Sequence, residues 1–147
     1  MAPDPEQIPQ GFSRHFRTSP LTDPWEPLYS KVESGAVLLA LRIRNAHCNS
    51  RGFAHGGLIS TLADNAMGLS LSEALGDLHQ ERPSGLVTIT LSLDFLGAAR
   101  IDQWLEVSPR VLRAGGSLGF VDCLVRADDQ PIARGNATFR IFRAGEN

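Results

Sequence analysis

The chain has 147 residues, the size of a single domain, and 42% of them are hydrophobic, which is enough to form a core without disulfide or metal crosslinks. The formal net charge is -2 and the basic residues are scattered, which argues against a nucleic-acid-binding protein. The chain begins without a signal-peptide pattern and has no apolar run near the roughly 20 residues of a membrane span, so we expect a cytoplasmic protein.

The first 27 residues hold six of the nine prolines, which predicts an irregular N-terminal extension with a short helix around residues 11–17. Residues 28–147 are expected to form one domain. A short strand over residues 28–33 turns at Ser34-Gly35 into a second strand over residues 36–44, whose apolar residues alternate onto one face.

The segment from His47 to Gly57 is rich in Gly and Asn, which predicts a loop. Residues 58–75 contain many Leu and Ala and no Pro, which predicts a helix ending at Gly76 as its C-cap. Apolar residues run almost all the way round this helix, so we expect it to be buried.

The rest of the chain, after a polar loop over residues 77–85, reads as strands over residues 86–96, 104–113, 118–126 and 131–142. In the first of them, alternation predicts Val87 to Phe95 at odd positions on one face and Thr88 to Asp94 at even positions on the other. Turns are expected at Gly115-Gly116 and at residues 128–130, the latter joining the last two strands as a hairpin. Strands around one long helix predict an α+β fold with an antiparallel sheet.

Asp64 is an anomaly, because it lies in the middle of an otherwise apolar helix. Charged residues are rarely buried unless they are paired. One interpretation is that Asp64 faces a polar edge or bonds to a nearby hydroxyl such as that of Ser60. The other is a catalytic carboxylate, since perturbed carboxylates mark functional sites in some proteins.

The loop before the helix favours the catalytic interpretation. The first turn of a helix has unpaired N–H groups and partial positive charge, and Gly56 and Gly57 would let a ligand approach this backbone closely. A carbonyl oxygen that becomes negative during hydrolysis would be stabilised there. A short stretch therefore supplies both an oxyanion site and a carboxylate, which are what thioester hydrolysis needs.

The spacing His47-x-Asn49-x-x-Gly52-x-x-His55-Gly56-Gly57, followed after six residues by Asp64, resembles the signature of hotdog-fold thioesterases of the phenylacetate-pathway type. The resemblance covers residues 35–142. It implies a hotdog fold, with one long central helix wrapped by a five- to six-stranded antiparallel sheet. It also implies a homodimer or dimer of dimers, with active sites at the subunit interface.

The resemblance also implies roles for individual residues. Gly56 would offer its backbone N–H to the thioester oxygen, and Asp64 of the partner subunit would act as general base or nucleophile. Asn49 would hold the attacking water or the thioester, and His55 would shape the loop or bond near the thioester. Thr88 would orient the water beside the aspartate.

A second set of residues would contact the substrate, with the hairpin residues among them at the nucleotide end of CoA. This set comprises Gly57, Arg113, Gly115, Gly116 and Ser117.

Other motifs are weaker. Residues 115–119 match GxSxG, but a strand follows where the nucleophile elbow requires a helix. His47, Cys48 and His55 do not complete a tetrahedral zinc site at normal spacing, and a disulfide between Cys48 and Cys123 is left open. We expect no metal and no cofactor, since coenzyme A is part of the substrate.

The sequence therefore predicts an acyl-CoA thioesterase. The first alternative is a non-catalytic protein of the same fold that binds acyl-CoA for regulation or buffering, because fold does not fix function. The second is a hydratase or dehydratase with His55 and Asp64 as acid and base. The acyl group, and whether CoA or a carrier protein bears it, stay open.

Overall fold

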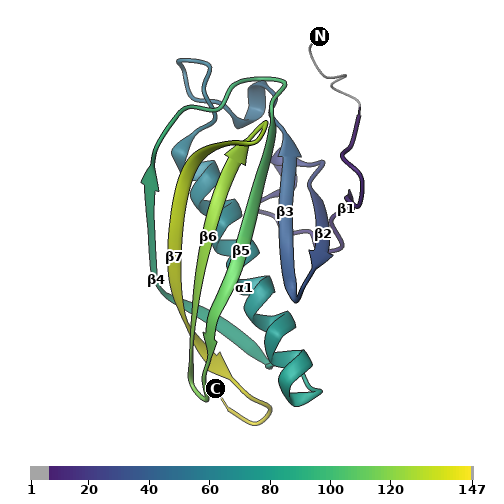
Figure 1. Ribbon diagram of the computed structural model, residues 1–147, viewed down its shortest axis with the longest axis vertical. Coiled ribbons are helices and arrows are strands. Elements are labelled where there is room, and N and C mark those ends of the chain that lie inside the picture. Colours follow the sequence, from purple (N-terminus) through teal and green to yellow (C-terminus); the bar gives the residue numbers. More distant parts are fainter. Residues whose placement is uncertain (1–6, 147) are drawn as a thin grey trace.

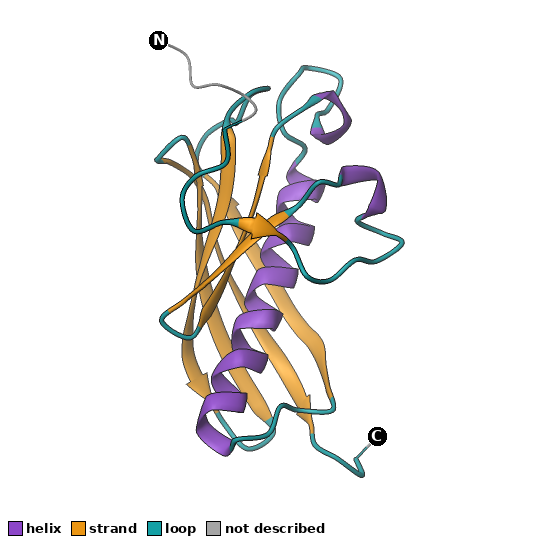
Figure 2. Ribbon diagram, turned by 90° about the vertical axis from the view of Figure 1, so that its right-hand side faces the viewer, coloured by secondary structure: helices purple, strands orange, loops and turns teal. Residues whose placement is uncertain are grey.

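The computed structural model describes residues 7–146, and in this range one long helix lies across one face of a seven-stranded antiparallel sheet (Figures 1 and 2). The sheet order is β1-β2-β3-β5-β6-β7-β4, which leaves β1 and β4 at the two edges. The elements are β1 (Ser13–Arg14), η1 (Asp23–Trp25), β2 (Tyr29–Glu33), β3 (Ala36–Arg42), η2 (Asn45–His47), α1 (Gly56–His79), β4 (Gly85–Phe95), β5 (Trp104–Ala114), β6 (Leu118–Ala127) and β7 (Gln130–Phe142). The predicted α+β fold is confirmed.

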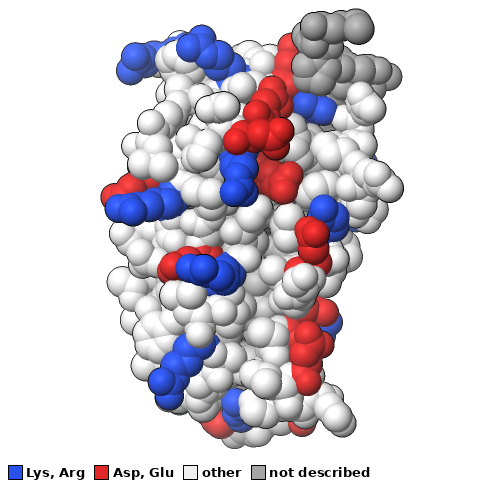
Figure 3. Space-filling model, viewed as in Figure 1, with Lys and Arg blue, Asp and Glu red and all other residues white. Residues whose placement is uncertain are grey.

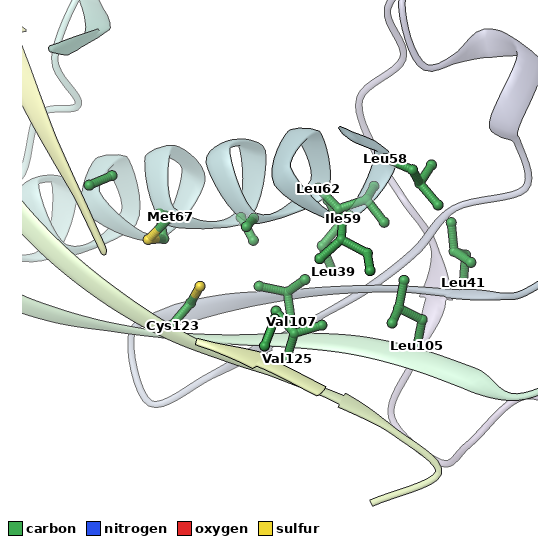
Figure 4. Packing of buried hydrophobic residues seen from close by; sticks show 14 of the residues in the cluster. Leu39, Leu41, Leu58, Ile59, Leu62, Met67, Leu105, Val107, Cys123 and Val125 are labelled. Atoms are coloured by element: carbon green, nitrogen blue, oxygen red, sulfur yellow. The ribbon is translucent and has the colours of Figure 1, made fainter. Parts of the chain in front are cut away.

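The core lies between α1 and the sheet, as Figure 4 shows. Leu62 and Met67 of the helix are fully buried and face strand residues such as Leu39 and Val107. A hydrogen bond links the helix to the sheet across this core: the Ser70 hydroxyl accepts from the Val37 backbone N–H at 2.9 Å. This packing fixes the rotation of α1, and so decides which helix residues face the edge strand β4.

The helix is longer than predicted, because it begins at Gly56 and ends at His79. Gly76 is not its cap. A Cβ on Gly76 would lie 3.2 Å from Cγ of Arg82, so the missing side chain lets Arg82 pass close over the helix. The helix ends instead at Gln80, which has the left-handed conformation that ends many helices (φ 58°).

The predicted helix around residues 11–17 is wrong. Ser13 and Arg14 form β1 and pair with β2, which gives the sheet its seventh strand. Gly11 turns the chain just before this strand with a φ of 92°, a conformation that glycine adopts without strain. The first six residues of the proposed extension lie outside the described range, and a domain boundary at residue 27 stays a prediction.

The predicted alternation along β4 is wrong in its first half. Thr88 pairs with Phe139 and Thr90 pairs with Thr138, so Ile89 is one extra residue in the strand. Because of this β-bulge, the odd-numbered side chains before it point to the opposite face of the sheet from the odd-numbered side chains after it. Thr88 therefore faces the helix, as Leu93 does, although their positions differ in parity.

The outer face of the sheet carries mixed charges, and Figure 3 shows acidic and basic groups interspersed over it. Arg134 lies 3.0 Å from Asp94, and Arg110 lies 3.8 Å from Asp122. Among residues 7–146, no helix has the length and apolar character needed to cross a membrane.

Candidate active site

Asp64 is half-buried on the side of α1 that faces β4. Its Oδ1 accepts a hydrogen bond of 2.7 Å from the Thr88 hydroxyl. Ser60, which the sequence offered as a partner, instead donates to the Gly56 carbonyl at 2.8 Å. The hydroxyl that holds Asp64 therefore comes from another element, and the carboxylate lines a cavity of about 420 Å³.

The start of α1 is capped by the side chain of His55. Its Nδ1 accepts a hydrogen bond from the Gly57 N–H at 2.8 Å, as an N-cap residue does. The Gly56 N–H is at the first helical position, where no carbonyl of the helix can accept it. Within residues 7–146 it makes no hydrogen bond, so of the two glycines Gly56 has the N–H left for a ligand.

Both glycines lie close to neighbouring side chains. A Cβ on Gly57 would lie 3.0 Å from Nδ1 of His55, and a Cβ on Gly56 would lie 3.2 Å from the Phe95 ring. The sequence had assigned both glycines to ligand approach. The structure adds that they let His55 and Phe95 close around the first turn of the helix.

Asn49 holds the loop that precedes the helix. Its Oδ1 accepts hydrogen bonds from the backbone N–H groups of Arg51 (2.9 Å) and Phe53 (3.2 Å). Gly52 makes the turn between them with a φ of 84°. Because the amide oxygen is occupied, the Asn49 side chain can offer only its NH₂ donors to a ligand.

His47 has a structural position. It is buried, its Nδ1 accepts from the Arg44 N–H at 3.0 Å, and its Nε2 donates to the Trp25 carbonyl at 2.9 Å. Burial, with a smaller contribution from the Arg44 charge, lowers the pKa of His47 from its ordinary value of 6.5. The neutral ring thus ties the loop to the N-terminal segment, a role that sequence spacing did not reveal.

Metal-ligating groups do not gather in the described part of the chain, where no three His, Cys, Asp or Glu side chains form a set that could hold an ion. Cys48 and Cys123 are both free thiols. Burial raises the pKa of the Cys123 thiol to about 11, so this cysteine is uncharged at neutral pH.

The candidate residues fall into separate groups in one chain. Gly56 and Asp64 are eight helical residues apart, or about 12 Å at a rise of 1.5 Å per residue. The hairpin of β5 and β6 is farther along, because Gly119 packs against Leu71, about 10 Å beyond Asp64 on the helix axis. Arg113 lines a different cavity, of about 730 Å³, near the C-terminal end of α1.

The cavity beside Asp64 also contains residues outside the predicted set. Gly68 and Ser72 follow Asp64 at intervals of four, which places all three on one face of the helix. A search for small and polar residues at this spacing could have found them. Residues 15–19, which form another wall of the cavity, have no such signal.

Comparison with known proteins gives consistent results. The family model of the thioesterase superfamily matches residues 51–133. PA0474 of Pseudomonas aeruginosa, which carries an esterase name, is 38% identical over 135 residues, 91% of this chain and 97% of that protein. Acyl-coenzyme A thioesterase 13 of Homo sapiens is 29% identical over 106 residues, 71% of each chain.

Among solved structures, smu.793 of Streptococcus mutans UA159 bound to acetyl-CoA superposes with a TM-score of 0.66 at 26% identity, covering 76% of this chain and 84% of that one. This likeness agrees with the helix-on-sheet architecture described above. The family predicted from the spacing of the loop motif and Asp64 is confirmed: the chain belongs to the thioesterase superfamily.

Proposed function

We propose that this protein hydrolyses acyl-CoA thioesters to a free acid and CoA, with Asp64 as general base or nucleophile. The observation that carries the proposal is the Asp64 carboxylate, held by Thr88 beside a cavity in a chain of the thioesterase superfamily. Human acyl-coenzyme A thioesterase 13 and the acetyl-CoA complex of smu.793 support CoA esters as the substrate class.

In the proposed reaction the thioester oxygen accepts a hydrogen bond from the Gly56 N–H. This donor, at the positive end of α1, stabilises the negative charge that develops on the oxygen. Asp64 takes a proton from water as the water oxygen attacks the carbonyl carbon, and the Asn49 amide and the Thr88 hydroxyl position that water. The C–S bond then breaks and the CoA sulfur takes up the proton. Direct attack by Asp64 would instead give an acyl anhydride that water hydrolyses.

The distance between Gly56 and Asp64 requires a second subunit in this mechanism. Groups about 12 Å apart along one helix cannot both touch a single thioester carbonyl. The edge strand β4 offers a pairing surface, because no other strand within residues 7–146 pairs with its free edge and the side chains of Val87 and Ile89 are more than half exposed. We propose that two copies pair through β4 about a twofold axis, so that Gly56 of one faces Asp64 of the other.

The test is release of free thiol from a panel of acyl-CoA esters by wild type and by Asp64→Asn. Asparagine preserves the shape of the side chain and accepts the Thr88 hydrogen bond, but it cannot take a proton. We expect a loss of about 100-fold or more in kcat with unchanged circular dichroism. Asp94→Asn is the matched control. Asp94 is on β4, the strand that carries Thr88, but it pairs with Arg134 on the outer face of the sheet.

Two results would count against the proposal. Turnover by Asp64→Asn near the wild-type rate would contradict the role of the carboxylate. Binding of acyl-CoA by wild type without any thiol release would favour a non-catalytic acyl-CoA-binding protein instead.

A further inference from the structure

The cavity beside Asp64 is closed on one side by the N-terminal segment. Figure 2 shows the segment that carries η1 passing α1 on the side away from the sheet. Residues 15–19 of this segment line the cavity, opposite the helix face that carries Asp64 and Ser72. We call residues 15–19 the N-terminal wall.

Hydrogen bonds fix the N-terminal wall at both ends. At its start, the His15 N–H donates to the Leu28 carbonyl at 2.9 Å, which continues the pairing of β1 with β2. At its end, the Ser19 carbonyl accepts from the N–H of Thr22 at 3.2 Å, and Thr22 is buried. The wall is therefore part of the folded domain and can define the shape of the cavity.

The N-terminal wall presents polar groups to the cavity. The exposed residues Arg17 and Thr18 line it, and neither side chain makes a hydrogen bond or ion pair with residues 7–146. Nδ1 of His15 is buried and also has no partner in that range. Ser19 differs, because its hydroxyl bonds to that of Thr22 at 3.0 Å.

The helix presents matching groups across the cavity. Asn65 and Ser72, both half-buried, make no side-chain hydrogen bond with residues 7–146. Between them Gly68 lies close to the Phe139 ring, which a Cβ would approach to 3.4 Å. A pocket for a plain alkyl chain would be lined mainly by apolar side chains, whereas unengaged donors line this one from two elements.

From this arrangement we infer that the N-terminal wall is a specificity determinant: it selects acyl groups that carry a hydroxyl or carboxylate at the end away from the thioester. The inference rests on the proposed function, which places the thioester at Asp64 and the acyl group in this cavity. The wall lies outside residues 51–133, the part that matches the family model.

Three CoA esters with six-carbon acyl groups test the inference: hexanoyl, 6-hydroxyhexanoyl and the six-carbon dicarboxylic monoester. We expect wild type to prefer one of the polar-ended esters over hexanoyl-CoA by at least about tenfold in kcat/KM, because a hydroxyl or carboxylate can bond to Arg17, Thr18 or the buried Nδ1 of His15, whereas a methyl end cannot. In the double variant Arg17→Leu/Thr18→Val, this ratio should fall toward one while hexanoyl-CoA turnover is retained.

The matched control is Arg134→Leu/Thr138→Val, which makes the same chemical changes on β7, on the face of the sheet away from the helix. It should keep the wild-type ratio. Equal turnover of the three esters by wild type, or a preference that survives in the Arg17→Leu/Thr18→Val variant, would overturn the inference and leave the thioesterase function intact.

Binding of non-hydrolysable thioether analogues of the same three esters distinguishes failure of the proposed thioesterase function from failure of the inference about the N-terminal wall. If no ester is hydrolysed, the proposed function fails. The affinities of the thioethers for wild type and for the two double variants then still decide whether the N-terminal wall selects the polar end. Affinities that do not depend on the end group would overturn the inference.

Discussion

The Thr88 hydroxyl donates a 2.7 Å hydrogen bond to the Asp64 carboxylate, and a β-bulge between Thr88 and Thr90 makes this contact possible. Without the extra residue Ile89, continuous alternation from Leu93 would turn Thr88 to the outer face of the sheet. β-Bulges often occur beside active sites, where they re-aim a side chain. In this protein the bulge brings strand β4 and helix α1 together at one carboxylate.

Replacing Thr88 by valine should lower kcat for acyl-CoA hydrolysis by about 10- to 100-fold. The reason is that a hydrogen bond to a charged group contributes about 1.5–3 kcal/mol. Thr88→Ser should retain most of the activity. The control is Thr90→Val, since Thr90 pairs with Thr138 on the outer face. Equal rates for Thr88→Val and Thr90→Val would show that Thr88 does not position Asp64.

Replacing Gly56 by proline should remove the proposed oxyanion donor with little damage to the helix. Proline is favoured at the first helical position, and His55 already has the extended conformation that a residue before proline adopts (φ -68°, ψ 134°). We expect kcat to fall by about 100- to 1000-fold.

Gly56→Ala is the control for this substitution. It adds a Cβ next to the Phe95 ring, as proline does, but it keeps the N–H. Loss of activity in the alanine variant as large as in the proline variant would assign the effect to crowding of Phe95 and not to the missing donor.

Replacing His55 by alanine should lower the free energy of unfolding by about 1 kcal/mol, because the cap on the Gly57 N–H is lost. His55→Asn should recover most of this loss, since asparagine is a good N-cap. Urea denaturation at one fixed protein concentration measures both. If His55→Asn is as unstable as His55→Ala, His55 stabilises the loop by something other than capping.

Stability should depend on pH through His47. Its pKa is lowered in the folded protein, so the unfolded chain binds the proton more readily. The stabilisation is therefore complete above about pH 6.5, the ordinary histidine pKa, and is lost as the pH falls from there through the lowered pKa. His47→Gln should reduce this loss of unfolding free energy between pH 7.5 and 5.5.

The slope with pH is the measurement for this prediction, because His47→Gln also changes stability at every pH. The pKa of His15 is lowered by burial too, and His15 contributes equally to both proteins. Parallel slopes for wild type and His47→Gln would contradict the assignment to His47.

Much of the fold could be predicted from the sequence, because local patterns determine it. Alternation along β3, β6 and β7 and the long run of Leu and Ala in α1 are properties of neighbouring residues. The bulge at Ile89 could not be predicted, since it depends on the register with Thr138 and Phe139 of β7. The strand β1 was missed for a similar reason, because its two residues are held by pairing with β2 and not by their own propensity.

The candidate site divides in the same way. Asp64 and the glycine loop were visible because a charge in an apolar helix and a fixed spacing are sequence features. The wall formed by His15 to Ser19 was not visible, since it is placed by the pairing of His15 with Leu28, which lies 13 residues away in the sequence. The roles of Arg113 and of residues 115–117 toward CoA stay predictions, and these residues lie away from Asp64 in the same chain.

A mixed dimer tests the central claim most directly. Asp64→Ala and Gly56→Pro chains would be co-expressed with different tags, and the heterodimer isolated through both. If each site combines Asp64 of one subunit with Gly56 of the other, the heterodimer has one intact site and one site with both defects. We predict about half of the wild-type acyl-CoA thiol release per dimer, from parents that are each nearly inactive. Activity no higher than that of the parents would contradict a site shared between subunits.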